Sequence, residues 1–169
     1  MEHVRSHAAC VDVGGKVYVF GGFDGQQPLN SIEVFDPEMG TWSMSRVHLH
    51  TPRSGTRAVV LAGRVYVAGG FDGENRLKSV ECFSFGPGGV TRHQVPDMAT
   101  ARSNFAMVVI DNQILVAGGY SDPTVISRCE LYSPRSNTWS EAADMPSSKS
   151  ALDAVAVPGS NNLDIFLGK

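Results

Sequence analysis

The sequence lacks long hydrophobic runs, paired cysteines and any excess of basic charge. Its apolar stretches are about as long as a β-strand, well short of the ~18 residues that a membrane helix needs. Its cysteines, Cys10, Cys82 and Cys129, are scattered and form no CxxC pair, which argues against a disulfide framework or a zinc site. The formal net charge of −3 is unlike the basic balance of most nucleic-acid-binding domains.

The N-terminus also lacks the basic start and apolar centre that mark a signal peptide. Together with the scattered cysteines, this predicts a reduced, cytoplasmic protein that binds neither a membrane nor nucleic acid. The 169 residues, 42% of them apolar, are enough to bury a core.

One stretch occurs three times in recognisable form, at residues 15–25, 63–73 and 112–122. In each copy a short apolar run, rich in β-branched and aromatic residues, ends in two glycines. The second glycines, Gly22, Gly70 and Gly119, are spaced by 48 and 49 residues. This pattern predicts a buried strand followed by a backbone turn that leaves no room for side chains.

Other residues recur at the same two intervals. They are the arginines Arg5, Arg53 and Arg102 before each run, and the glutamates Glu33, Glu81 and Glu130 after it. Trp42 and Trp139 lie nine residues beyond their glutamates, and the second copy has Val90 at that interval. A fourth copy begins near Met145, with Lys149 in the arginine position.

Each unit reads as four short strands separated by turn residues, with no competing helical periodicity. In the second unit we expect strands at about 56–61, 65–69, 79–85 and 90–95. A unit of this size cannot bury both of its faces alone, so neighbouring units must pack together. The sequence therefore predicts an all-β protein built from β-propeller blades. The predicted units are blade 1 at 1–47, blade 2 at 48–96, blade 3 at 97–144 and half of a fourth blade at 145–169.

The double glycines, the runs at 33–37 and 130–134, and the two tryptophans resemble kelch repeats over nearly the whole sequence. The regular spacing is most similar to the kelch-like class, in which BTB and BACK domains precede a propeller of usually six blades. That resemblance implies a propeller that holds a protein partner, often for a cullin–RING ubiquitin ligase, while other members bind actin. Some kelch propellers are enzymes.

This sequence contains no BTB or BACK segment and only three and a half blades. We therefore expect a fragment or short form of a longer kelch protein, with contact to a cullin only through domains that are absent here.

Topology predicts which loops share a face of the propeller. In an up-and-down blade, the loop after the double glycine lies at the same end as the segment that leads into the first strand. One face should therefore collect the loops at 23–30, 71–78 and 120–125 with the segments at 5–7, 53–55, 102–104 and 149–151. Loops on a rigid scaffold are where binding residues concentrate.

We predict partner-binding residues in both groups of this face. The segments before the first strands contribute Arg5, His7, Arg53, Ser54, Arg102 and Asn104, and the loops contribute Gln26, Gln27, Glu74, Asn75, Arg76, Tyr120 and Ser121. Arginine suits bidentate recognition of an acidic peptide. A structural alternative is that each arginine pairs with the recurrent glutamate of its own unit. The loop polar groups could equally be ordinary solvated side chains, and Phe23, Phe71 and Tyr120 could pack beside the glycine turns.

No residues predict catalysis, a metal or a cofactor. His48 and His50 lie in a connector with no cysteine nearby. Cys82 and Cys129 fall in predicted third strands, where a thiol acts as a small apolar group. Trp42 and Trp139 are expected to fill the space between blades, and Val90 predicts a thinner interface at blade 2.

Overall fold

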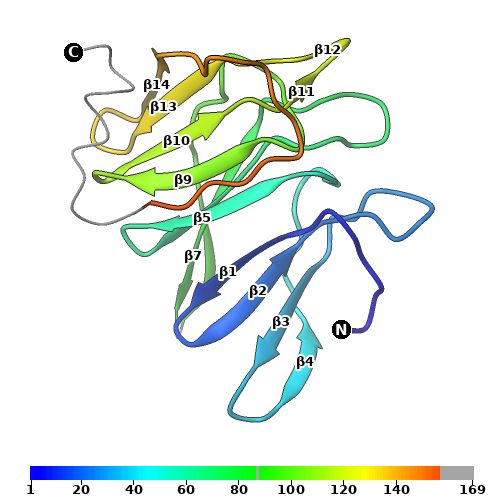
Figure 1. Ribbon diagram of the computed structural model, residues 1–169. Coiled ribbons are helices and arrows are strands. Elements are labelled where there is room, and N and C mark those ends of the chain that lie inside the picture. The colour runs from blue at the N-terminus through cyan, green and yellow to red at the C-terminus, as the bar shows by residue number, and fades with distance from the viewer. Residues whose placement is uncertain (87, 157–169) are drawn as a thin grey trace.

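The computed structural model describes residues 1–86 and 88–156, and these form three four-stranded antiparallel sheets (Figure 1). Blade 1 holds β1 (Ala9–Val13), β2 (Lys16–Phe20), β3 (Ile32–Asp36) and β4 (Thr41–Met44). Blade 2 holds β5 (Arg57–Leu61), β6 (Arg64–Ala68), β7 (Val80–Gly86) and β8 (Gly89–His93). Blade 3 holds β9 (Ala106–Ile110), β10 (Gln113–Ala117), β13 (Cys129–Ser133) and β14 (Thr138–Ala142). The all-β prediction and the three four-stranded units are confirmed.

A small hairpin of β11 (Tyr120–Ser121) and β12 (Thr124–Val125) extends the third blade. Residues 145–156 run alongside β9 (Figure 1), and the second strand expected for a fourth blade lies outside the described residues. Among the residues that the structure describes, no helix is long and apolar enough to cross a membrane.

The apolar residues of β6 and β10 are buried on both faces of the strand, which explains their continuous apolar runs, while Val17 and Tyr18 of β2 are half-buried. In β6, Val65 and Val67 join the core between blades 1 and 2, while Tyr66 and Ala68 join the core between blades 2 and 3. Successive side chains alternate between the two faces of a strand, so one strand serves two interfaces. The hydrophobic core is therefore a set of layers between blades.

The double glycines lie where two other segments approach the backbone. A Cβ on Gly69 would stand 2.5 Å from the carbonyl oxygen of Arg102 in the next blade, and one on Gly70 would stand 3.0 Å from the carbonyl oxygen of Ser54. Both residues also have positive φ, +59° and +105°. The Gly70 N–H donates to the Arg102 carbonyl at 2.8 Å, so the turn joins blade 2 to blade 3.

The register of blade 2 differs from the sequence prediction. Phe35 pairs with Trp42 in blade 1, and the corresponding Phe83 pairs with Arg92, while Val90 pairs with Phe85. The β7–β8 hairpin is two residues longer than the β3–β4 hairpin, so a constant repeat interval selects the wrong residue. Val90 is therefore not the counterpart of Trp42, and Arg92 occupies that position.

The interface of blades 1 and 2 gains side chains from the longer hairpin. The Phe85 ring centroid lies 4.4 Å from that of Tyr18, and Val90 packs against the same cluster. The Arg92 guanidinium lies 4.8 Å above the Phe83 ring, and its Nη1 is 2.8 Å from a carboxylate oxygen of Glu81. The prediction of a thinner interface at blade 2 assumed that Val90 replaces the tryptophan, and the strand register shows that this assumption was wrong.

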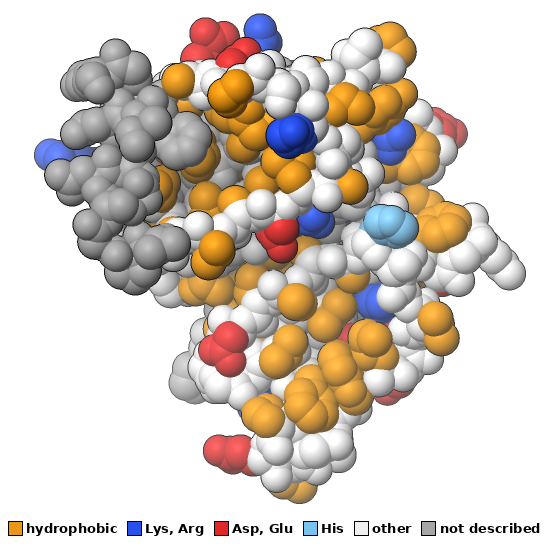
Figure 2. Space-filling view, viewed as in Figure 1, with side chains coloured by type: hydrophobic (Ala, Val, Ile, Leu, Met, Phe, Trp, Pro, Cys, Tyr) orange, Lys and Arg blue, Asp and Glu red, His pale blue; other side chains and the backbone are white. Residues whose placement is uncertain are grey.

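The two tryptophans have different surroundings. Trp139 packs against the core between blades 2 and 3, and its indole N–H donates to the carbonyl of Pro96 at 3.0 Å. The prediction that it fills the space between blades is confirmed. Trp42 packs on Phe35, with 5.1 Å between ring centroids. Its counterparts, Arg92 in blade 2 and Trp139 in blade 3, each face the preceding blade, so this face of blade 1 points away from blade 2. Hydrophobic side chains gather over this blade in the lower part of Figure 2.

The glycine geometry predicts a large difference between two alanine substitutions. Gly63→Ala should cost about 1–2 kcal/mol of unfolding free energy from positive φ alone, because nothing lies within 4 Å of its Cβ position. Gly69→Ala should cost roughly 3 kcal/mol or more, since the same strain is joined by overlap with the Arg102 carbonyl and the Phe105 ring. Urea denaturation of both variants measures this; equal losses would contradict the close approach.

The tryptophans supply a second matched pair. Trp139→Ala should lower the unfolding free energy by about 3 kcal/mol, because packing and a hydrogen bond are both lost. Trp42→Ala should cost about 1–2 kcal/mol, because its ring joins no core between the described blades. The midpoints of urea unfolding compare them, and a larger loss for Trp42→Ala would show that the tryptophans were assigned to the wrong interfaces.

Candidate partner-binding face

The predicted sharing of one face is confirmed by backbone pairing. In each blade the residue after the double glycine bridges to the serine that precedes the first strand: Ser6 with Phe23, Ser54 with Phe71, and Ser103 with Tyr120. The three loops, 23–30, 71–78 and 120–125, project together on the right of Figure 1. We call this side the loop face.

An open arc of backbone hydrogen bonds passes from blade to blade at the centre of the loop face. The N–H of Gly55 donates to the His7 carbonyl at 2.9 Å, that of Asn104 to the Gly55 carbonyl at 2.8 Å, and that of Ala151 to the Asn104 carbonyl at 2.8 Å. All four residues have positive φ, between 54° and 63°. We call these four residues the central ring, since they follow the propeller axis, although their three hydrogen bonds form an open arc. Each blade is thus fixed to the next at the position where the predicted specificity side chains begin.

The three recurrent arginines lie inside the blades. Arg5 is 2.5 Å from Glu33, Arg53 is 3.2 Å from Glu81, and Arg102 is 2.5 Å from Glu130, with arginine side chains 1%, 1% and 0% exposed. Their Nη1 atoms also donate to the carbonyls of the first glycines of the pairs, at 2.7–2.8 Å. These are the arginine–glutamate pairs that the structural alternative describes, and we leave the three arginines out of the partner surface.

Each buried glutamate also fastens the connector that leads into its blade. Glu33 accepts the backbone N–H groups of Glu2 and His3, and Glu130 accepts those of Ala99 and Thr100. Burial alone would raise the pKa of Glu33, but the N–H of Glu2 and the Arg5 guanidinium outweigh it and hold that pKa below its usual range. Glu33 is therefore ionised at neutral pH.

Burial also acts on the partner cations. It lowers the pKa of Arg53 and of Arg102, while the carboxylates of Glu81 and Glu130 act in the opposite direction.

Loops 23–30 and 71–78 have fixed backbones and exposed side chains. The Asp24 carboxylate accepts the N–H groups of Gln26 and Gln27 at 2.7 and 2.8 Å, and Asp72 does the same for Glu74 and Asn75. The N–H of Gln27, with that of Gln26, lowers the pKa of Asp24. The side chains of the four capped residues are exposed, as a partner surface requires.

Arg76 joins the second loop to the third. Its guanidinium lies 4.2 Å from the Phe71 ring centroid and 4.9 Å from that of Tyr120, and its Nε is 3.4 Å from a carboxylate oxygen of Asp122. The Arg76 side chain is 22% exposed. Arg76 and Tyr120 therefore form an inter-loop stack, with Ser121 half-buried beside it in the β11–β12 hairpin.

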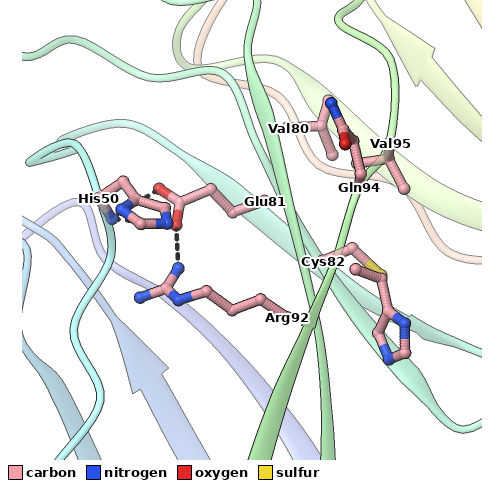
Figure 3. A pocket seen from close by; sticks show the side chains of 8 residues that line it. His50, Val80, Glu81, Cys82, Arg92, Gln94 and Val95 are labelled. Carbon is pink, nitrogen blue, oxygen red and sulfur yellow. Dashed lines mark hydrogen bonds and ion pairs between the residues drawn. The ribbon is translucent and has the colours of Figure 1, made fainter.

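A cleft with a volume of about 430 Å³ lies on the outer strands of blade 2 (Figure 3). Its charged groups and histidines have partners: Glu81 accepts the His50 backbone N–H and the Arg92 guanidinium, and the His93 ring bonds the Ser84 hydroxyl at 2.9 Å. The Cys82 thiol in this cleft is buried, and burial raises its pKa, as it does for Cys129. The prediction that both thiols act as buried apolar groups is confirmed.

The described part of the protein, 1–86 and 88–156, holds no group of three histidine, cysteine or acidic side chains that could bind a metal.

Arg57 is the residue of this face that the sequence analysis missed. It is the first residue of β5, and its guanidinium donates to the carbonyls of Thr56 and Leu152 at 3.2 and 3.1 Å. The corresponding residues of the other two blades are Ala9 and Ala106. A charge that occurs in one repeat and not in the others was the available signal.

Comparisons with known proteins agree on one family. The model of the KLHDC2/KLHL20/DRC7 Kelch-repeats domain matches residues 1–167. Kelch-like protein 40 of Xenopus tropicalis is 28% identical over 151 residues, which cover 85% of this chain and 24% of that protein. Human Kelch-like protein 6 is 58% identical over 33 residues, 20% of this chain and 5% of that protein. The solved structure titled "Structure of YjhT" superposes with a TM-score of 0.75 at 16% identity, covering 86% of this chain and 54% of that one.

The Arg5–Glu33 pair predicts a defined pH dependence. Because the pKa of Glu33 is lowered by folding, its contribution to stability is present above the unfolded pKa of about 4.3 and is lost as the pH falls through the folded value. Glu33→Gln should therefore destabilise the protein at about pH 7, and the difference from the unchanged protein should narrow toward about pH 3. Urea unfolding across this range measures it.

Glu38→Gln, on the exposed β3–β4 turn, is the control and should change stability little at any pH in this range. A Glu33→Gln difference that stays constant from about pH 7 to about pH 3 would contradict the role of the Glu33 charge.

Proposed function

The chain belongs to the kelch-repeat family of protein-interaction domains, and we propose that it is the substrate-binding part of a kelch-like adaptor for a cullin–RING ubiquitin ligase. It spans a quarter or less of the length of the curated relatives named above, so the role of the whole protein is part of this proposal. In that role the partner lies on the loop face. The cullin is reached through BTB and BACK domains.

One observation carries the proposal: side chains that differ from blade to blade are exposed on a face whose backbone is fixed. Gln26 and Gln27 in blade 1 correspond to Glu74 and Asn75 in blade 2, and both pairs are capped by an aspartate in the same way. A constant backbone with variable exposed side chains is the arrangement by which scaffolded loops distinguish partners.

We assign the partner surface to the accessible part of the loop face. It comprises His7, Gln26, Gln27, Glu74, Asn75, Asn104 and Ser121, together with the stacked side chains of Arg76 and Tyr120. Within this set we expect Tyr120 to contribute most to binding of the partner, since large half-buried aromatic side chains contribute strongly at interfaces. Ser54 acts through its backbone bridge to Phe71.

Two other functions have distinct tests. An actin-binding kelch protein would co-sediment with F-actin, and this alternative draws on the same loop face. A propeller enzyme would turn over a sugar or bind a metal; the buried thiols with raised pKa supply no nucleophile for it.

The proposal predicts that binding depends on loop side chains that do not support the fold. Gln26, Gln27, Glu74 and Asn75 changed together to alanine should reduce capture of a partner at least about tenfold with little loss of stability, since these residues hold the loops through backbone groups, which the substitutions keep. Affinity capture with the full-length protein, quantified by mass spectrometry, and thermal unfolding measure both.

The control changes Glu38, Arg64 and Arg135 to alanine. All three are exposed at the opposite end of the blades, Glu38 and Arg135 on turns and Arg64 as the first residue of β6. Captured proteins that accumulate when cullin activity is inhibited would support the ligase role. A capture profile that is the same for the loop variant, the control and the unchanged protein would overturn the proposed surface.

A further inference from the structure

Arg57 lies at the centre of the loop face, next to the central ring. The first strands of the blades pack side by side, so β5 lies between β1 and β9 and borders the axis about which the blades are arranged. Arg57 opens β5 two residues after Gly55 of the central ring, and it reaches the carbonyl of Leu152, which follows Ala151 of the same ring. Its guanidinium thus bridges blade 2 and the segment beyond blade 3.

The polar contacts of Arg57 leave donors unused. Nη1 donates to the Thr56 carbonyl and Nη2 to the Leu152 carbonyl, while Nε–H is buried without a hydrogen-bond partner. A guanidinium has five N–H donors, so three remain. Both acceptors are neutral carbonyls, and no carboxylate among residues 1–86 and 88–156 lies within ion-pair distance of it.

This makes Arg57 unlike the other arginines of the described residues. Arg5, Arg53, Arg76, Arg92 and Arg102 each lie within 4 Å of a carboxylate. Arg46, Arg64, Arg128 and Arg135 are exposed, where water solvates the charge. Arg57 has no carboxylate partner and, because it is half-buried, water solvates its charge only in part. A partly desolvated charge with an unsatisfied donor gains free energy when a counter-charge arrives.

We propose that Arg57 is the anion-recognition residue of the loop face and binds a carboxylate of the partner. The planar fork suits bidentate binding of an aspartate, a glutamate or a terminal carboxylate. This inference rests on the proposed function, since it specifies the chemistry of the partner that the loop face holds. Anion recognition is thereby assigned to Arg57 and not to the three recurrent arginines, whose charges are paired with buried glutamates.

The charges around Arg57 are of both signs. The surrounding loops carry the carboxylates of Asp24, Asp72, Glu74 and Asp122, of which Asp122 is paired with Arg76. The same segments carry the exposed side chains of Lys78 and Lys149. The matching ligand is therefore a peptide with one carboxylate that reaches the centre, and the outer loops place no single sign of charge on its flanking residues.

The test uses a displayed library of random peptides, about a dozen residues long, as the probe, selected on the full-length protein. Selected peptides should share one acidic residue or a free terminal carboxylate, and should compete with each other for the loop face. Against Arg57→Gln, which keeps side-chain hydrogen bonding and removes the charge, their affinity should fall at least about tenfold. Arg64→Gln, an exposed arginine at the opposite end of the same blade, is the matched control and should leave affinity unchanged.

A double-mutant cycle identifies the contact. If the acidic residue of the peptide is changed to its amide, the affinity for the unchanged protein should fall as far, and Arg57→Gln should then have little further effect. Arg57→Lys keeps the positive charge and should retain more affinity than Arg57→Gln. Thermal unfolding of each variant shows whether a loss of affinity comes from the charge or from a loss of the fold.

Two negative results have different meanings. Peptides that lose binding in the loop variant but bind Arg57→Gln normally would overturn the inference and leave the proposed function standing. Peptides that are insensitive to both the loop variant and Arg57→Gln would overturn the proposed function as well.

Discussion

The structure depends on a buried arginine–glutamate pair that every complete blade repeats. Each pair joins the segment before the first strand, the glycine turn after the second strand and the third strand itself. Buried ion pairs often contribute little net stability, because desolvation offsets the attraction. Their value here is geometric: the arginine donates to carbonyls of the glycine turn, and that turn sets the position of the next blade. The same arginine side chain therefore neutralises the buried glutamate and holds the glycine turn in place.

Most of the architecture could be predicted because the repeat interval reports strands that are buried on both faces. The runs that end in Gly22, Gly70 and Gly119 could not occupy a solvated strand. The failure at Val90 has a specific cause: the alignment of repeats assumes equal hairpins, and the β7–β8 hairpin is two residues longer. Arg92 then faces Phe83, and a cation replaces the tryptophan of the other blades. Hairpin length is local information that a spacing between repeats cannot supply.

The loop face, too, was predictable in one part and not in another. Which loops meet was predictable from strand direction, and the exposed side chains of Gln26, Gln27, Glu74 and Asn75 follow from it. The role of the arginines was not predictable, because the spacing of Arg53 fits a surface ring and an internal pair equally well. Burial decided between them. Arg57 shows the reverse case, a residue outside the repeat pattern whose contact with the Leu152 carbonyl, 95 residues away in sequence, could not be read from the repeat spacing.

The central ring restricts which side chains can stand closest to the propeller axis. Its members all adopt the left-handed backbone region, which favours glycine and asparagine, tolerates histidine and disfavours bulky or β-branched residues. Large apolar anchors are therefore disfavoured at these positions in any sequence that keeps the ring. In this chain the four innermost positions are accordingly a histidine, a glycine, an asparagine and an alanine. The larger exposed side chains lie in the outer loops, where the backbone conformation does not restrict them in this way.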